Sequence, residues 1–169
     1  MYLLSLDLST KSSGWAVFND GELIDHGCIT ASSTDLINRI HKMTNEINSL
    51  ILNKYQINKI IVEEVRPEGG YGVGNQKTHK ALMWLQAAMA IFIHDNYPDI
   101  EIEYIYPSSW RATLGIKNGR GIKRQTLKEA DVEFVKNKYN INVNDDIADA
   151  ICIGLAQYTK QDDNEINWA

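Results

Sequence analysis

The apolar positions near the N-terminus predict three strands joined by short turns. Residues 2–9 (YLLSLDLS) form a mostly apolar run that ends in polar residues, which is typical of a buried strand. Residues 14–19 and 22–30 flank Asp20 and Gly21, a dipeptide that favours a tight hairpin turn. Because the connections are so short, these strands are expected to pair antiparallel.

Helical periodicity begins after this hairpin. From Leu36, apolar residues recur three or four positions apart, at 36, 40, 43, 47 and 50, and Ser33 or Thr34 is available as the N-cap. Two further strands are predicted at residues 59–65 and 101–106. The remaining helices are predicted near residues 75–96, ending before Pro98, near 124–138, and from Asp145 onward.

The order of these elements predicts an α/β fold. The two strands that follow helices are expected to lie parallel to the first strand, which gives a five-stranded mixed sheet with helices on both faces. The fourth strand then neighbours the first. A chain of 169 residues is expected to form a single domain, 1–169. The helix at 75–96 is apolar nearly all round, so it is either a central core helix or one with a face in a dimer interface.

Composition narrows the class of protein. Hydrophobic residues make up 44% and charged residues 23% of the chain, the balance of an ordinary globular protein. Cys28 and Cys152 are too few for a disulfide framework and form no CxxC pair. The longest apolar run, 81–93, is shorter than the ~20 residues that span a bilayer. Without a basic N-terminal leader, the sequence predicts a cytoplasmic protein with no membrane association.

Acidic residues occur at three places where an ordinary core would exclude them. Asp7 lies within the first apolar strand, and Glu63 and Glu64 end the run Ile-Ile-Val of the fourth strand. Asp146 and Asp149 are three residues apart and share one face of the last helix. A salt bridge or a helix cap explains each place alone, but the topology brings the first and fourth strands together.

Two of these assignments have a neighbouring alternative. Glu63 and Glu64 point to opposite faces of a strand, so only one of them can join Asp7. Asp145 competes with Asp146, although Asp145 lies one residue off the face shared with Asp149.

Clusters made only of oxygen ligands suit hard divalent cations such as Mg²⁺. Two such ions about 4 Å apart would activate a water and stabilise the leaving oxygen in phosphodiester cleavage. Four carboxylates balance the charge of two divalent ions. This chemistry needs no side-chain nucleophile, and the sequence shows no serine, histidine and aspartate with the spacing of a known triad.

Along nearly its whole length, the chain resembles the RuvC family of Holliday-junction resolvases, which belong to the ribonuclease H-like superfamily. The resemblance rests on LSLDLSTKSSGWAV, IIVEEV, NGRGIKRQ and DDIADAICIG. It implies a ribonuclease H-like fold and two Mg²⁺ ions, for which Mn²⁺ can substitute. The metal ligands and catalytic carboxylates that it implies are Asp7, Glu63, Asp146 and Asp149. The family pattern favours Glu63 over Glu64, since its glutamate stands two residues before a valine.

A basic segment separates the last strand from the last helix. It holds six basic residues and no acidic one, so its charge is +6 and the rest of the chain carries −11. We expect it to bind DNA phosphate. The resemblance implies that Lys123 is important for activity and lies near the cleaved phosphate. The expected DNA contacts in this segment are Arg111, Lys117, Arg120, Lys123, Arg124 and Lys128.

A glycine-rich loop follows the fourth strand. In the resembling family, an aromatic residue just after the catalytic strand disturbs base stacking at the junction centre, but Arg66 stands at that position here. Tyr71, which lies among the glycines, is expected to supply a stacking face instead. Lys77 and Lys80, at the start of the next helix, are expected to add phosphate contacts.

Three other functions compete with this one. Sugar kinases and actin-like ATPases share the first-strand motif D-x-G/S-T-x-x-x-G, but they place nucleotide between two domains, for which 169 residues are too few. A catalytically silent junction-binding module of the same fold would favour loss of the acidic residues. A ribonuclease H-like nuclease for RNA/DNA hybrids would leave the NGR segment without a role.

The sequence therefore predicts a crossover junction endodeoxyribonuclease that makes paired nicks in Holliday junctions and other branched DNA, in recombination and repair. Because symmetric resolution needs two active sites, a homodimer is expected. The net charge of −5, unusual for a DNA-binding protein, falls to −1 without the four proposed ligands. The sequence indicates neither a base preference nor whether a branch-migration partner is required.

Overall fold

The computed structural model describes residues 1–65, 73–119 and 121–166 as one α/β unit. The strands are β1 (Tyr2–Asp7), β2 (Ser12–Asn19), β3 (Glu22–Thr30), β4 (Ile57–Glu63) and β5 (Glu101–Ile105). The helices are α1 (Leu36–Ile47), the short π-helix η1 (Asn48–Leu52), α2 (Val73–Asn96), α3 (Pro107–Thr113), α4 (Arg124–Tyr139) and α5 (Asp145–Ile166).

The five strands form one mixed sheet in the order β3-β2-β1-β4-β5. β1, β2 and β3 pair antiparallel, whereas β4 lies parallel to β1 and β5 lies parallel to β4. The predicted five-stranded mixed sheet is thus confirmed, including the contact between the first and fourth strands. The ends of β1 and β4 with Asp7 and Glu63 point the same way because the strands are parallel.

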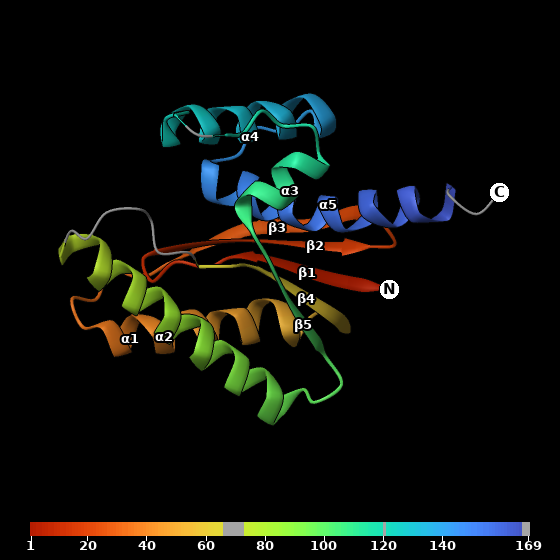
Figure 1. Cartoon of the computed structure of the whole chain (residues 1–169). Helices are drawn as coiled ribbons and strands as arrows, with labels where there is room; N and C mark the ends of the chain where they lie inside the picture. Colours follow the sequence, from red (N-terminus) through yellow and green to blue (C-terminus); the bar gives the residue numbers. More distant parts are fainter. Residues whose placement is uncertain (66–72, 120, 167–169) are drawn as a thin grey trace.

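Helices cover both faces of the sheet, as expected (Figure 1). α1, η1 and α2 pack on one face, and α5 packs on the other with α3 beside it. α4 lies outside α5, farther from the sheet (Figure 1). No helix in the described ranges combines the length and the apolar character needed to cross a membrane.

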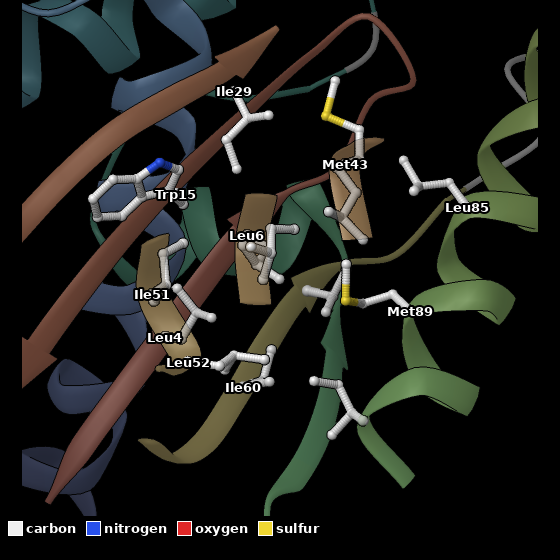
Figure 2. Close-up of a cluster of buried hydrophobic side chains, with 14 of the residues drawn as sticks. Leu4, Leu6, Trp15, Ile29, Met43, Ile51, Leu52, Ile60, Leu85 and Met89 are labelled. Carbon is white, nitrogen blue, oxygen red and sulfur yellow. The ribbon is translucent and has the colours of Figure 1, made fainter. Parts of the chain in front are cut away.

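Alternation along β1 assigns its side chains to two cores. Leu4 and Leu6 join the core under α1 and α2, and Figure 2 shows Leu4 beside Ile51 and Leu52 in this core. The intervening positions face α5, and Leu3 joins that second core. Asp7 continues this second set of alternate positions, which places it on the α5 side at the end of the strand.

Two close approaches bring α5 onto the sheet. A Cβ atom on Gly14 of β2 would come within 1.8 Å of the backbone oxygen of Asp146, so only glycine permits the contact. Farther along α5, a Cβ on Gly154 would meet the Phe18 ring at 2.3 Å. Ser5, fully buried in β1, donates its hydroxyl to the backbone oxygen of Ala150 at 2.7 Å. α5 is therefore held directly against β1 and β2.

Three local features differ from the sequence predictions. The N-cap of α1 is Asp35, whose side chain accepts from the Asn38 amide at 2.8 Å, and not Ser33 or Thr34. The π-helix η1 continues α1 where an ordinary helical turn was expected. α3 was not predicted, because its seven residues are too few for a periodic pattern, although Pro107 occupies the helix start that proline favours.

α2 has one apolar side in the core and another that is exposed, so the core role left open by the sequence is confirmed and the dimer interface stays a prediction. Leu85, Met89 and Ile93 are buried in the core under the sheet. On another side of the same helix, Met83, Trp84 and Ile91 remain exposed, and Ile91 is 62% exposed. A helix with one apolar side in the core and another facing solvent is a candidate for contact with a second molecule.

Candidate active site

The ends of the neighbouring strands β1 and β4 carry the first two candidate ligands. Leu6 pairs with Val62 across the parallel ladder, so Asp7 and Glu63 follow one residue later on adjacent strands. Ile61 of β4 joins the core on the α5 face, and the alternation of β4 places Glu63 on that face as well. Both carboxylates are partly buried.

The start of α5 supplies the other two. Asn144 caps this helix, because its side-chain oxygen accepts from the Ile147 amide at 2.9 Å. Because the backbone of Asp146 packs directly on Gly14 of β2, the first turn of α5 lies against the sheet beside β1. Asp146 accepts a hydrogen bond from the Ser12 hydroxyl of β2, and Asp149, 5% exposed, lies one turn farther along the helix.

The charges of these groups show that they lie together. Burial raises the pKa of Asp7 to about 8, helped by the negative charges of Glu63 and Asp146. Burial also raises the pKa of Asp149 to about 9, and the charges of Asp7, Asp131 and Glu63 add to this rise. Carboxylates that raise one another's pKa in this way lie within one acidic cluster.

The position of Glu63 is set from two sides. The indole N–H of Trp110 in α3 donates to Glu63 Oε2 at 2.9 Å, and the Gln86 side chain in α2 donates to the Glu63 backbone oxygen at 2.7 Å. Burial raises the pKa of Glu63, while the Trp110 hydrogen bond and the Arg111 charge oppose that rise. Gln86 is the single polar residue in the apolar run of α2, and its place in that run was a signal for this contact.

The neighbouring acids lie in different surroundings. The Glu64 charge raises the pKa of Tyr104 on β5, after burial as the larger cause, which places Glu64 toward the edge strand. Asp145 accepts from Lys128 of α4, and this contact lowers the pKa of Asp145. Glu63 and Asp146 are therefore the members of each pair whose charges act on Asp7.

Sequence reasoning missed Trp110 and Asp131. Asp131 of α4 is fully buried and receives Arg111 Nε at 3.0 Å and a second guanidinium nitrogen at 2.7 Å. The missed signal was the position of Asp131, one helical turn before the buried Val135 on the inner side of α4. No comparable signal pointed to Trp110, because it lies in the short helix α3.

Two of the predicted DNA contacts have unexpected environments. The Arg111 side chain is only 9% exposed and faces Asp131, which corrects the expectation of an exposed phosphate contact. Lys128 binds Asp145 and lies 3.9 Å from Asp146, so it faces the carboxylates and not open solvent. Both cations offset the negative charge of the cluster.

The other basic residues lie at the surface. Lys117 is exposed after α3, Lys123 is exposed at the N-cap of α4, and Arg124 follows it. The charge of Arg124 lowers the pKa of both Asp7 and Glu63, although burial outweighs it, so this end of α4 faces the carboxylates. On α2, Lys77 and Lys80 are exposed, with the Lys80 ammonium 4.9 Å from the Trp84 ring centre. Arg120, Tyr71 and Arg66 lie outside the described residues.

The donor set suits a hard divalent cation, but it is not assembled around one. Among residues 1–65, 73–119 and 121–166, no three acidic, histidine or cysteine side chains already stand in a metal-binding arrangement. Asp149 Oδ1 is buried without a hydrogen-bond partner, and a cation would satisfy it. If Asp7, Glu63, Asp146 and Asp149 hold a divalent cation, their carboxylates would have to turn toward it.

Comparison with known proteins supports the fold. No family model matches the sequence, and a search of curated proteins gives no significant match. Among solved structures, RuvC from Thermus thermophilus in complex with a Holliday junction substrate superposes with a TM-score of 0.71 at 13% identity, over 96% of this chain and 95% of that one. A second T. thermophilus RuvC structure gives 0.71 at 14% identity, over 97% of each chain.

The yeast mitochondrial Holliday junction resolvase Ydc2 also matches, with a TM-score of 0.59 at 14% identity over 98% of this chain and 82% of that one. At such low identities, the similarity is one of architecture. The strand order, the helices on both faces and the near-complete coverage agree with it. The chain therefore has the ribonuclease H-like fold seen in RuvC.

Proposed function

We propose that the protein is a metal-dependent endodeoxyribonuclease that resolves Holliday junctions and other branched DNA by paired nicks. The observation that carries this proposal is the convergence of Asp7, Glu63, Asp146 and Asp149 at one end of the sheet. The RuvC-like architecture over nearly the whole chain supports it, since one of those structures holds a Holliday junction substrate. A role in recombination and repair of DNA follows from such a reaction.

The four carboxylates would hold two Mg²⁺ ions, with Mn²⁺ as a substitute. When bound, such ions supply activation of a water and stabilisation of the leaving oxygen at the cleaved phosphate. Asp7 and Asp149 must release their protons before they can act as ligands, so ion binding becomes stronger as the pH rises through about 8 to 9. Ser12 keeps the Asp146 carboxylate oriented toward the cluster.

DNA would lie across the carboxylates and the exposed basic residues beside them. We assign Lys123 to the neighbourhood of the cleaved phosphate, because the start of α4 faces the cluster. Lys77, Lys80, Lys117, Arg120 and Arg124 would contact further phosphates, and Tyr71 would stack on an unpaired base. Arg111 and Lys128 are assigned instead to the carboxylate cluster.

Paired nicks in a four-way junction need two active sites, so we propose a homodimer. The exposed apolar side of α2, with Met83, Trp84 and Ile91, is the surface that we assign to the contact between the two copies. Its position on the same helix as Lys77 and Lys80 would place the interface next to DNA-binding residues.

A nicking assay tests the central proposal. Four-way, three-way and duplex DNA and an RNA/DNA hybrid are incubated with the protein in Mg²⁺, Mn²⁺ or EDTA. We expect metal-dependent paired nicks in the four-way substrate. Asp7→Asn and Asp149→Asn should each lower the nicking rate by at least 100-fold while junction binding is retained. Asp99→Asn, in the exposed turn before β5, is the matched control and should cut normally.

Each contrary result would change a different part of the proposal. Junction binding without cleavage by the wild type would indicate a silent binding module of the same fold. Cleavage of the hybrid alone would indicate a ribonuclease H-like activity. Nicking that persists in both aspartate variants would overturn the assignment of the site.

A further inference from the structure

The short helix α3 places two consecutive buried side chains against two different candidate ligands. Trp110 is fully buried and donates its indole N–H to Glu63 Oε2 at 2.9 Å. The Arg111 guanidinium lies over the Trp110 ring, 4.1 Å from the ring centre. The same stretch of α3 thus reaches Glu63 on β4 and approaches Asp149 on α5.

Asp131 of α4 holds Arg111 in place. Arg111 Nε donates to both Asp131 oxygens, at 3.2 and 3.0 Å, and a terminal nitrogen donates to Oδ2 at 2.7 Å. The same terminal nitrogen lies 3.9 Å from Asp149 Oδ1, which is beyond hydrogen-bond distance. Asp149 Oδ1 is left buried without a hydrogen-bond partner, although a cationic side chain stands next to it.

Burying Asp149 Oδ1 without a hydrogen-bond partner costs free energy, and a bound cation would remove this cost. A buried acceptor beside a guanidinium gains a charge-assisted hydrogen bond if the guanidinium turns toward it. The two-nitrogen contact with Asp131 prevents that turn. Asp131 is itself within side-chain hydrogen-bonding reach of Asp149, and this contact helps to raise the pKa of Asp149. Asp149 Oδ1, which contacts neither Asp131 nor Arg111 within hydrogen-bond distance, stays available to a metal ion.

We propose that Trp110 and Asp131 are positioning residues of the metal site, Trp110 by fixing the Glu63 carboxylate and Asp131 by keeping Arg111 away from Asp149. This inference rests on the proposed function, since it concerns the same four carboxylates. Neither residue touches the ion. Groups that orient metal ligands in this way commonly change metal affinity by 10- to 100-fold when they are replaced.

Mn²⁺ binding to the full chain without DNA tests the inference separately from catalysis, with free Mn²⁺ measured by electron paramagnetic resonance at pH 8. Trp110→Phe keeps the ring but removes the N–H, and we expect its Mn²⁺ affinity to fall at least 10-fold. Trp15→Phe removes an indole from the other core and should bind Mn²⁺ as the wild type does. Circular dichroism and thermal melting show whether each variant is folded.

Two variants test the second half of the proposal. In Asp131→Asn the Arg111 guanidinium is released toward Asp149, so Mn²⁺ affinity should fall by a similar factor. The double variant Arg111→Gln/Asp131→Asn removes the competing cation as well, and we expect its Mn²⁺ affinity to return to at least the wild-type value. The double variant removes both members of the buried Arg111–Asp131 ion pair and leaves neither one unpaired, so it provides a measurement even if Asp131→Asn does not fold.

The outcomes distinguish the two proposals. If the wild type binds no Mn²⁺ and does not nick, the proposed function fails. If the wild type binds Mn²⁺ and Trp110→Phe binds it equally well, the role of Trp110 is overturned. The same holds if Trp110→Phe and the control Trp15→Phe lose Mn²⁺ affinity by the same factor. A double variant that binds Mn²⁺ more weakly than the wild type would overturn the role of Asp131.

Discussion

At the scale of single residues, the raised pKa values of Asp7 and Asp149 predict that ionisation of these two carboxyls destabilises the fold. In an unfolded chain both carboxyls ionise near their ordinary pKa of 3.8, whereas in the fold burial raises the pKa values to about 8 and about 9. Between pH 3.8 and pH 8 to 9, the folded state therefore binds more protons than the unfolded state. Stability contributed by these groups is therefore present at low pH and is lost as the pH rises toward 8 to 9.

The change Asp7→Asn should remove part of this pH dependence. In EDTA, the melting temperature of the wild type should fall more steeply between pH 5.5 and pH 8.5 than that of Asp7→Asn, because asparagine does not ionise. At pH 8.5 the variant should melt several degrees higher than the wild type. Differential scanning fluorimetry over this range measures both slopes, and the comparison cancels the contribution of the histidines.

Asp99→Asn is the control for this experiment, since the side chain is exposed and distant from the cluster. Its slope should equal that of the wild type. Equal slopes for Asp7→Asn and the wild type would contradict the claim that Asp7 is buried among like charges. Added Mg²⁺ should raise the wild-type melting temperature at pH 8.5 and leave Asp7→Asn nearly unchanged.

The exposed start of α4 allows a second test at this scale. Replacing Lys123 and Arg124 with alanine should weaken junction binding and reduce the slope of log K against log salt by about 2, because each phosphate contact contributes about 0.9. Fluorescence anisotropy with labelled junction in EDTA measures the slope without cleavage. Lys54→Ala is the control, since its ammonium binds Asp25 at 2.8 Å. An unchanged slope would make this segment an ordinary solvated surface.

The choice between Glu63 and Glu64 illustrates what residue patterns could predict. The sequence shows that the two point to opposite faces, and only the family pattern favoured Glu63. In the structure, Ile60 and Val62 join the core under α1 and α2, whereas Ile61 joins the core under α5. Which core faces the start of α5 depends on tertiary packing, so alternation alone could not decide it.

At the scale of elements, the position of α5 depends on Gly14. Any side chain at this position would collide with the Asp146 backbone oxygen, which cannot move without the helix. We expect Gly14→Ala to displace the first turn of α5, to cost about 1–3 kcal/mol of stability and to lower Mn²⁺ affinity at least 10-fold. Thermal melting and Mn²⁺ titration of the folded variant measure the two effects.

Gly154→Ala provides the matched control on the same helix. Its Cβ would meet the Phe18 ring and the Ser5 hydroxyl, which also destabilises the packing of α5, but away from the carboxylates. It should lower the melting temperature with little effect on Mn²⁺ affinity. If both variants lost Mn²⁺ affinity equally while folded, the site would depend on the whole helix and not on this contact.

The elements themselves were predicted from sequence to different degrees. All five strands, their parallel or antiparallel direction and the contact of the first with the fourth follow from hydrophobic runs, turn residues and connection rules, because these signals are local and repeated. The place of β5 beside β4 was not predicted. α3 and η1 were missed, since five to seven residues carry too little periodicity. As α3 carries both Trp110 and Arg111, missing this helix meant missing the inner contacts of the site.

At the scale of the whole molecule, the distribution of charge differs from the one the sequence suggested. The basic segment 111–128 carries six positive charges, but Arg111 and Lys128 face the carboxylate cluster. The surface available to DNA is therefore less positive than the segment alone implies. With a net charge of −5, attraction to ordinary duplex should be weak, and binding should depend on the shape of a junction.

The proposed dimer contact on the exposed side of α2 would bring two such surfaces together. If a second copy covers Ile91, then Ile91→Glu places a charge in an apolar contact and should separate the copies. A lone molecule can still cut one strand, so a supercoiled plasmid with an extruded cruciform should become nicked circles. The wild-type pair should instead cut both strands within one encounter and yield linear plasmid. Sedimentation velocity gives the oligomeric state of the same samples.

Ile37→Glu separates this effect from a general loss of apolar surface. Ile37 lies on the neighbouring helix α1 and is 58% exposed, close to the 62% of Ile91. This control should sediment as the wild type does and yield linear plasmid. Linear product from an Ile91→Glu variant with wild-type sedimentation would assign the pairing of nicks to another surface. Nicked circles from a variant that is still dimeric would mean that α2 aligns the two sites without holding the copies together.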